Sequence, residues 1–144
     1  MNADRARIGF IGAGWWATAN HMPILAARED VELAAVCRLG AEELEQVRDH
    51  YGFEFASEDY LELLECELDG VVISSPHSRH YEHAKAALEK GVPVMVEKPM
   101  TTKASEARDL VRIARDQGVE LAPLRGREAV RRGHDRAHAE EHRP

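Results

Sequence analysis

The sequence predicts an α/β protein built on one doubly wound parallel sheet of about six strands, with helices on both faces. Between residues 7 and 122, short β-rich runs alternate with longer helical patterns, which is typical of strand-helix-strand units. The run Val71–Ser74 is apolar in character and does not alternate, as expected of a central parallel strand that is buried on both faces. We expect the strand order 3-2-1-4-5-6 in a single domain.

The first half of the chain predicts two strands and three helices. They are a strand at 8–11, a helix at 14–28 with a break at Pro23, a strand at 31–37, a helix at 41–51 and a helix at 58–64. Leu44, Val47 and Tyr51 follow one another at three- and four-residue spacing, which favours the helix at 41–51. Ser57 is expected to be the N-cap of the next helix, because its hydroxyl can accept a hydrogen bond from a free amide.

The second half predicts strands at 71–74, 94–96 and 119–121, a helix at 78–90, and a last helix that begins after Thr102. Gly91 and Gly118 are expected to end the two helices, since glycine adopts the left-handed conformation of a helix C-terminus easily. Thr102 is expected to cap the last helix. Its apolar face is formed by Ala107, Leu110, Val111 and Ala114.

Composition and charge exclude several classes of protein. Hydrophobic residues make up 44% of the 144-residue chain and charged residues 31%, as in an ordinary globular domain. The net charge of −7 argues against binding to nucleic acid or to an anionic membrane surface, since phosphates attract a basic face. Cys37 and Cys66 are too few for a disulfide framework. No apolar run approaches the roughly 18 to 20 residues that span a bilayer, and we expect a cytoplasmic protein.

The last part of the chain differs in character. Residues 123–144 hold six arginines and three histidines but almost no large apolar residue, so they cannot bury a face. We expect residues 1–122 to form the domain and residues 123–144 to be a disordered tail. An Arg-, Ala-, Gly- and His-rich stretch is also what an out-of-frame GC-rich coding sequence yields, so a frameshifted or truncated gene is the expected origin.

A glycine-rich turn follows the first predicted strand and opens a helix. Residues 12–17 read G-A-G-W-W-A, the spacing of a dinucleotide-binding fingerprint in that setting. Gly12 would permit the tight turn, Gly14 the approach of backbone amides to a pyrophosphate, and Ala17 close packing of helix on strand. The alternatives are a turn that binds nothing and one that binds S-adenosylmethionine. Trp15 and Trp16 are explained equally well as core or interface aromatics and as walls of a cleft.

Arg38 lies 21 residues beyond Ala17, at the end of the second predicted strand. A residue at this place meets the ribose of a bound adenosine. An acid would bind the ribose hydroxyls of NAD, whereas an arginine can pair with the 2′-phosphate of NADP. We therefore expect NADP, with NAD as the second choice, unless Arg38 is a solvated surface residue.

Two further segments carry a family resemblance. Ser75-Pro76-His77, with His80 behind it, follows the central strand, and Glu97-Lys98-Pro99 follows the next strand. Together with the glycine turn, they resemble the T-P-N-x-x-H and E-K-P motifs of the glucose-fructose oxidoreductase and inositol dehydrogenase (Gfo/Idh/MocA) family. The resemblance covers residues 7 to about 122. Ser75-Pro76-His77 stands in place of T-P-N, and His80 matches the family histidine.

The resemblance implies a Rossmann-type domain of an NAD(P)-dependent oxidoreductase that moves hydride to or from a sugar, a cyclitol or a related compound. Lys98 and His80 would be the catalytic residues. The Lys98 ammonium would polarise a carbonyl or stabilise an alkoxide, and Glu97 and Pro99 would fix the turn that aims it. The cofactor would be bound by Gly12, Gly14, Trp15, Trp16, Ala17, Arg38, Ser75, Pro76, His77, His80, Glu97 and Lys98.

The family places its other acid/base group in a second domain, for which this sequence shows no counterpart. We therefore expect weak or no turnover, a sugar-like substrate only if a second domain is supplied, and self-association through the face that domain would cover. A stand-alone dinucleotide sensor or scaffold and a methyltransferase-like domain are the alternative functions. No metal site is expected, because no cysteine or acid is predicted to converge on His77, His80 and His83.

Overall fold

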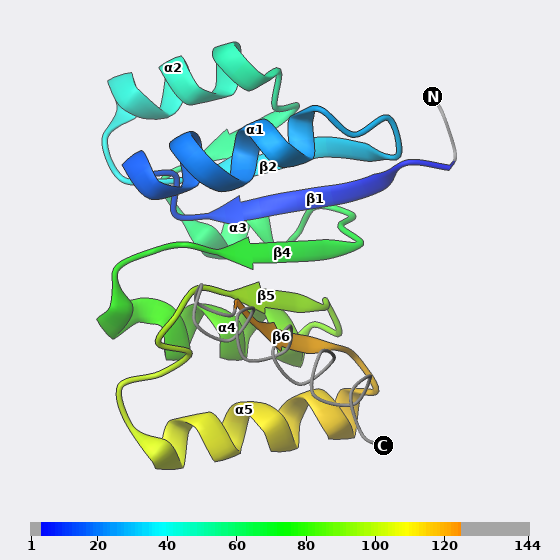
Figure 1. The fold of residues 1–144 in the computed structure, drawn as a ribbon, viewed down its shortest axis with the longest axis vertical. Helices are drawn as coiled ribbons and strands as arrows, with labels where there is room; N and C mark the ends of the chain where they lie inside the picture. Colours follow the sequence, from blue (N-terminus) through cyan, green and yellow to red (C-terminus); the bar gives the residue numbers. More distant parts are fainter. Residues whose placement is uncertain (1–3, 125–144) are drawn as a thin grey trace, which may run out of the picture.

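The structure, a computed structural model, describes residues 4–124. Six parallel strands form one sheet in the order β3-β2-β1-β4-β5-β6, which confirms the predicted fold class and strand order (Figure 1). The strands are β1 (Ala6–Ile11), β2 (Val31–Cys37), β3 (Phe55–Ser57), β4 (Gly70–Ile73), β5 (Val94–Val96) and β6 (Leu121–Pro123). The predicted elements did not include β3, a three-residue edge strand that is only half-buried.

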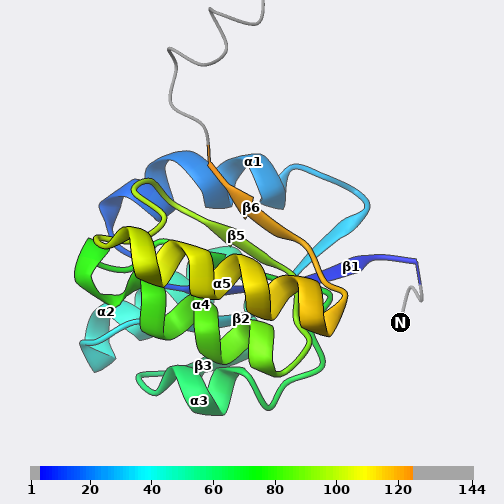
Figure 2. The ribbon, with the colours of Figure 1, turned by 90° about the horizontal axis from the view of Figure 1, so that it is seen from below.

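Helices cover both faces of the sheet. In chain order they are the π-helical turn η1 (Ala17–His21), α1 (Met22–Ala26), α2 (Ala41–Tyr51), α3 (Tyr60–Leu63), the 3-10 turn η2 (His77–Arg79), α4 (His80–Glu89) and α5 (Ala104–Gln117). One core cluster packs Met22 of α1 and Leu44 of α2 against Phe10 of β1. The other joins α3, α4 and α5 to the opposite face, with Leu88 and Leu110 fully buried (Figure 2). The fold is thus a three-layer α/β/α sandwich.

The helix after the glycine turn continues past Pro23, where a break was expected. The irregularity comes earlier, in η1, where the amide of Met22 donates to the carbonyl oxygen of Ala17 five residues before it. Pro23 has no amide hydrogen, so the regular bonding pattern fails near it, and a π turn is one way in which a helix absorbs such a defect.

Two expected N-caps are wrong. Ser57 pairs with Cys37 as the last residue of β3, so its backbone is already committed to the sheet. Asp59 is the N-cap of α3, and its carboxylate accepts from the amide of Leu61 at 2.8 Å. In the last helix, Lys103 precedes Ala104 as the N-cap and contributes no side-chain bond, so Thr102 is not the cap.

The last strand lies two residues later than expected. The amide of Val119 still donates to Ala114 of α5, across Gly118 in its left-handed conformation, so β6 begins only at Leu121. Pro123 closes β6, and the amide of Leu124 donates to the carbonyl oxygen of Val96 at 2.8 Å. The sheet thus extends beyond the expected boundary at 122, and the rest of the expected tail, 125–144, lies outside the described residues. Between residues 4 and 124, no helix has the length and apolar character needed to cross a membrane.

Candidate functional site

The candidate site lies at the carboxyl ends of β1, β2, β4 and β5. After β1 the chain enters helices on one face of the sheet, and after β4 it enters α4 on the other face (Figure 1). A crevice opens where such connections diverge, and this is where open α/β sheets bind their ligands. A cleft of about 770 Å³ occupies this position. The glycine turn, Arg38, and Ser75, Pro76 and His77 line it.

Gly12 holds two loops in close contact. Its φ is +94°, and a Cβ built there would lie 2.3 Å from the backbone nitrogen of Ser75 and 2.4 Å from the carbonyl carbon of Ser74. No side chain fits at that distance, and the positive φ independently favours glycine. The Gly12 amide also donates to the carbonyl oxygen of Cys37 at 2.9 Å. One residue therefore ties together the ends of β1, β2 and β4.

Gly14 and Ala17 have the positions expected of a dinucleotide fingerprint. A Cβ at Gly14 would meet no atom within 4 Å, so the backbone there borders open space in the cleft. Ala17 is buried in the core cluster that includes Phe10 and Met22. The first helical bond runs from the amide of Thr18 to Gly14 at 3.1 Å, which leaves the preceding amides at the helix start without a helical partner. Such amides favour a phosphate.

Arg38 lines the cleft at the end of β2. Its Nη1 donates to the carbonyl oxygen of Ala13 at 3.0 Å and its Nε to that of Leu39 at 3.2 Å. The guanidinium is therefore fixed beside the glycine turn. Glu58, which the sequence analysis missed, also lines this end and accepts from the amide of Gly40 at 2.6 Å.

Cys37 is not a nucleophile in this cleft. Burial, and then the carboxylates of Asp59 and Glu58, raise the pKa of its thiol to about 11. The thiol is therefore neutral near pH 7, and a neutral thiol is unreactive.

Helix α4 carries a histidine that the site prediction also missed. His83 Nδ1 lies 2.8 Å from Ser75 Oγ, and the His83 ring packs 4.5 Å, centroid to centroid, from Tyr60. Burial, and then the positive charge of Arg79, lower the pKa of His83 to about 4. His83 is therefore neutral at pH 7 and fixes the Ser75 hydroxyl at the cleft wall.

His80 joins the loops after β4 and β5. Its side chain is fully buried, with Nδ1 2.7 Å from the carbonyl oxygen of Pro99 and Nε2 2.8 Å from that of Ser75. Carbonyl oxygens only accept, so a ring nitrogen of His80 that bears a hydrogen donates to one of them. This geometry leaves no ring nitrogen free for a substrate, so it favours a role in holding the two loops.

A second cavity of about 320 Å³ adjoins the first and is lined by Lys98. The two cavities share Trp16, Ser74, Ser75 and His77, and we call them the two parts of the cleft. The Lys98 side chain is exposed, and its amide donates to Glu97 Oε2 at 3.1 Å. Among residues 4–124, the Lys98 ammonium forms no ion pair, so it is available to an oxygen of a bound molecule. All the site residues expected from the sequence thus line one or both of these adjoining cavities, apart from Ala17 in the core and Pro99 in the turn after Lys98.

The Glu97 carboxylate is anchored by three donors. Trp16 Nε1 donates to Oε1 at 2.8 Å, His21 Nε2 lies 2.5 Å from the same oxygen, and the third donor is the Lys98 amide. Burial acts to raise the pKa of Glu97, but the hydrogen bonds from Trp16 and His21 outweigh it and the net pKa is lowered. Glu97 is therefore a carboxylate at neutral pH. His21 is another site residue that the sequence analysis did not identify.

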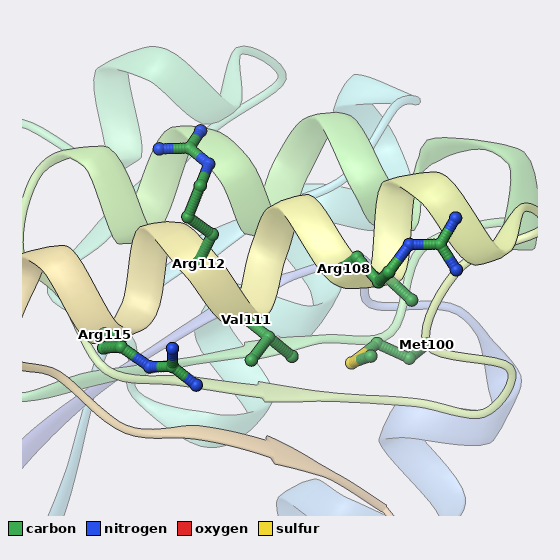
Figure 3. Close-up of a pocket in the computed structure, with 6 residues that line it drawn as sticks. Met100, Arg108, Val111, Arg112 and Arg115 are labelled. Atoms are coloured by element: carbon green, nitrogen blue, oxygen red, sulfur yellow. The ribbon is translucent and has the colours of Figure 1, made fainter.

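A separate groove of about 280 Å³ lies on α5 and shares no residue with either part of the cleft. Arg108, Val111, Arg112 and Arg115 project from α5, and Met100 lies opposite them in the loop after β5 (Figure 3). The glycine turn, Arg38 and Lys98 are all outside it. None of the site residues predicted from the sequence lines this groove.

The strand order, the glycine turn and the position of the cleft together define a Rossmann-type α/β domain. The sequence pattern of the family described as "Oxidoreductase family, NAD-binding Rossmann fold" (Gfo/Idh/MocA) matches residues 6–123. The chain belongs to this family.

Relatives and solved structures agree with this assignment. D-glucoside 3-dehydrogenase of Escherichia coli (strain K12) is 36% identical over 123 residues, which are 85% of this chain and 35% of the relative. Scyllo-inositol 2-dehydrogenase (NADP(+)) of Bacillus subtilis (strain 168) is 29% identical, over 86% of this chain and 34% of its own. The 3-ketoreductase from Actinomadura kijaniata, solved with NADP and TDP-benzene, superimposes with a TM-score of 0.78 at 31% identity, over 83% of this chain and 37% of the other.

The chain therefore spans about a third of the length of these relatives. The part that it matches is their nicotinamide-cofactor-binding Rossmann domain.

Proposed function

We propose that the chain binds NADP along the cleft and forms the cofactor-binding part of an oxidoreductase that acts on a sugar, a cyclitol or a related hydroxyl or keto compound. The observation that carries the proposal is that the two parts of the cleft adjoin and share the lining residues Trp16, Ser74, Ser75 and His77. One part is lined by the glycine turn and Arg38, and the other by Lys98. The relatives named above are a glucoside dehydrogenase, an inositol dehydrogenase and a ketoreductase, which supports this substrate class.

The donors in the cleft fit a phosphorylated dinucleotide. The open space at Gly14 and the free amides beside it would accept the pyrophosphate. Arg38, held by Ala13 and Leu39, would pair with the 2′-phosphate. Arg38 uses two of its five N–H donors in these bonds, so three remain for a phosphate. The Glu58 carboxylate at the same end accepts from the Gly40 amide. This favours NADP over NAD.

The bound cofactor would supply or accept the hydride. The Lys98 ammonium, exposed and without an ion pair among the described residues, would polarise the carbonyl of a keto substrate and give a proton to the developing alkoxide oxygen. His80, with both nitrogens bonded to backbone carbonyls, would hold the Lys98 turn against the Ser75 loop. Trp16 would wall the reacting end of the cleft.

We further propose that a polypeptide of these 144 residues binds the cofactor but turns over little or no substrate. Hydride transfer needs donor, acceptor and proton source held in productive geometry, and such positioning contributes roughly 7 to 11 kcal/mol. Among the described residues that line the reacting end of the cleft, Glu97 and His80 are already hydrogen-bonded within the chain, so few groups besides Lys98 remain to orient a sugar. Robust turnover of sugars or cyclitols with NADP by this polypeptide, lost in Lys98→Ala, would contradict this proposal.

The cofactor proposal is tested by titrating the chain with NADPH and NADH and following the fluorescence of its two tryptophans, both of which line the cleft. We expect NADPH to bind more tightly by on the order of 1 to 3 kcal/mol. Arg38→Ala should remove most of this preference. Arg28→Ala is the matched control, since Arg28 is an exposed arginine paired with Asp30 outside the cleft. An unchanged preference in Arg38→Ala would exclude the 2′-phosphate role.

A further inference from the structure

We propose that His21 is a positioning residue, which together with Trp16 holds the Glu97 carboxylate and so fixes the direction of Lys98 toward the nicotinamide end of the cleft. We call these three side chains the Glu97 latch. The inference rests on the proposed function, because it assumes that a nicotinamide cofactor lies in the cleft. It adds a residue that lies outside the glycine turn and the two motifs named above.

The latch uses both oxygens of the carboxylate. Oε1 accepts hydrogen bonds from the indole N–H of Trp16 and from the imidazole of His21, and Oε2 accepts one from the amide of Lys98. The side chains of His21 and Glu97 are only 18% and 13% exposed. Hydrogen bonds to a charged group in a partly dehydrated position are short and directional. The carboxylate therefore has little freedom to turn, and neither has the peptide that precedes the Lys98 side chain.

The π turn explains how two residues of one helix reach the same oxygen. Trp16 and His21 are five positions apart, so in a regular α-helix they would point about 140° away from each other. In η1 the bonding runs over five residues, as the bond from the Met22 amide to Ala17 shows, and this brings positions five apart onto one side of the helix. The irregular turn thus aims His21 at Glu97.

The Lys98 turn is also held from its other side. The Glu97 amide donates to the carbonyl oxygen of Ile73 at 2.9 Å, and the Pro99 carbonyl oxygen lies 2.7 Å from His80. The backbone on both sides of Lys98 is therefore fixed, and the latch adds the link to the helix of the glycine turn. A change at His21 would reach the reacting end of the cleft through Glu97 while leaving Arg38 and the adenosine end untouched.

This difference between the two ends provides the test. Calorimetry would measure the affinity of the 144-residue chain for NADPH and for 2′-phospho-ADP-ribose, which keeps the adenosine half and lacks the nicotinamide. We expect His21→Phe to weaken NADPH binding about fivefold or more and to leave the fragment within about twofold. His21→Gln, whose amide can still donate to Glu97, should recover most of the loss. His50→Phe, an exposed histidine on α2, is the control.

A second measurement follows Lys98 directly. The chain has four lysines, Lys85, Lys90, Lys98 and Lys103, so reductive methylation with ¹³C gives few signals, and Lys98→Arg assigns the relevant one. NADPH should shift the Lys98 signal in the unaltered chain and in His21→Gln, and the shift should be lost in His21→Phe and in Trp16→Phe. The signal of Lys103 should not change in any of them.

The outcomes separate the two proposals. If the unaltered chain binds neither ligand, the proposed function fails and the latch with it. If both ligands bind but His21→Phe weakens them equally or not at all, or if the Lys98 signal responds normally in that variant, the proposed function stands and the latch is wrong.

Discussion

At the scale of single residues, two glycines of one turn have different tasks. Gly12 is required by the fold, because its φ is positive and a Cβ would overlap the backbone of Ser74 and Ser75. Gly14 has neither constraint, since a Cβ there meets no atom. The glycine at position 12 is thus required for packing, whereas the glycine at position 14 leaves space for a ligand.

This contrast gives a matched pair of variants. Gly12→Ala should lower the free energy of unfolding by about 2 kcal/mol or more, since the two loops must separate or the backbone must strain. Gly14→Ala should change stability by less than about 1 kcal/mol but weaken NADPH binding at least tenfold, because its methyl group enters the space of the pyrophosphate. Chemical denaturation and calorimetry measure the two effects. Equal stability of both variants would show that the Gly12 contact is not tight.

His83 predicts a pH dependence of stability. The pKa of His83 is lowered from 6.5 to about 4 in the folded chain. Between these two pH values the unfolded chain therefore binds a proton at His83 and the folded chain does not. The contribution is complete above pH 6.5 and is lost as the pH falls toward 4, at up to about 1.4 kcal/mol per pH unit. Denaturation at pH 7, 6 and 5 should show this slope. His83→Gln should flatten it, while His50→Gln, at an exposed site, should leave it unchanged.

At the scale of elements, the structure shows which patterns the sequence can specify. The strand at 71–74 and the helices at 41–51 and 78–90 are local patterns of apolar spacing and glycine ends, and the structure reproduces them closely. The edge strand β3 has three half-buried residues, too few for a periodic signal. The caps at Ser57 and Thr102 were wrong because the chain offers several adjacent polar residues and only the backbone conformation selects among them.

The corrected cap of α3 can be tested. Asp59→Ala removes the bond to the Leu61 amide and should cost about 1 kcal/mol of stability. Glu67→Ala, which removes an exposed carboxylate with no hydrogen bond or ion pair among residues 4–124, should cost less. The free energy of unfolding of the two variants decides this, and an equal or larger loss for Glu67→Ala would show that Asp59 does not cap the helix.

Some residues of the candidate site could likewise be predicted from the sequence, and others could not. Gly12, Gly14, Arg38, Glu97 and Lys98 stand next to strand ends, so their convergence follows from parallel topology and could be predicted. His21, Glu58, Tyr60 and His83 reach the same site only through a π turn, a loop or a helix face. No local pattern records such contacts, because they depend on how distant elements pack.

At the scale of the whole molecule, the helical cover is uneven. Val94 and Val96 of β5 are buried beneath α4 and α5, whereas Met95, on the opposite side of the strand, is 40% exposed. A parallel sheet normally has both faces covered. In the part of the chain that the structure describes, Met95 therefore places an apolar side chain in solvent on the less covered face of β5.

We expect this surface to cause the 144-residue polypeptide to self-associate. Sedimentation velocity should show an average mass that rises with protein concentration between micromolar and hundreds of micromolar. Met95→Lys should reduce the association. Leu61→Lys, at an exposed leucine of α3 on the other layer, should not. A concentration-independent monomer in the unaltered chain would exclude the expectation.

The close contact of Gly12 with Ser74 and Ser75 has a consequence for the arrival of a ligand. The glycine turn lies against the Ser74–Ser75 loop through backbone atoms and is also bonded to the end of β2 through Cys37, so these three segments cannot move independently. The binding surface is thus preorganised. The conformational entropy lost on binding is therefore mainly that of the ligand. Association should then be a single diffusional step, with an observed rate that rises linearly with NADPH concentration and reaches no plateau.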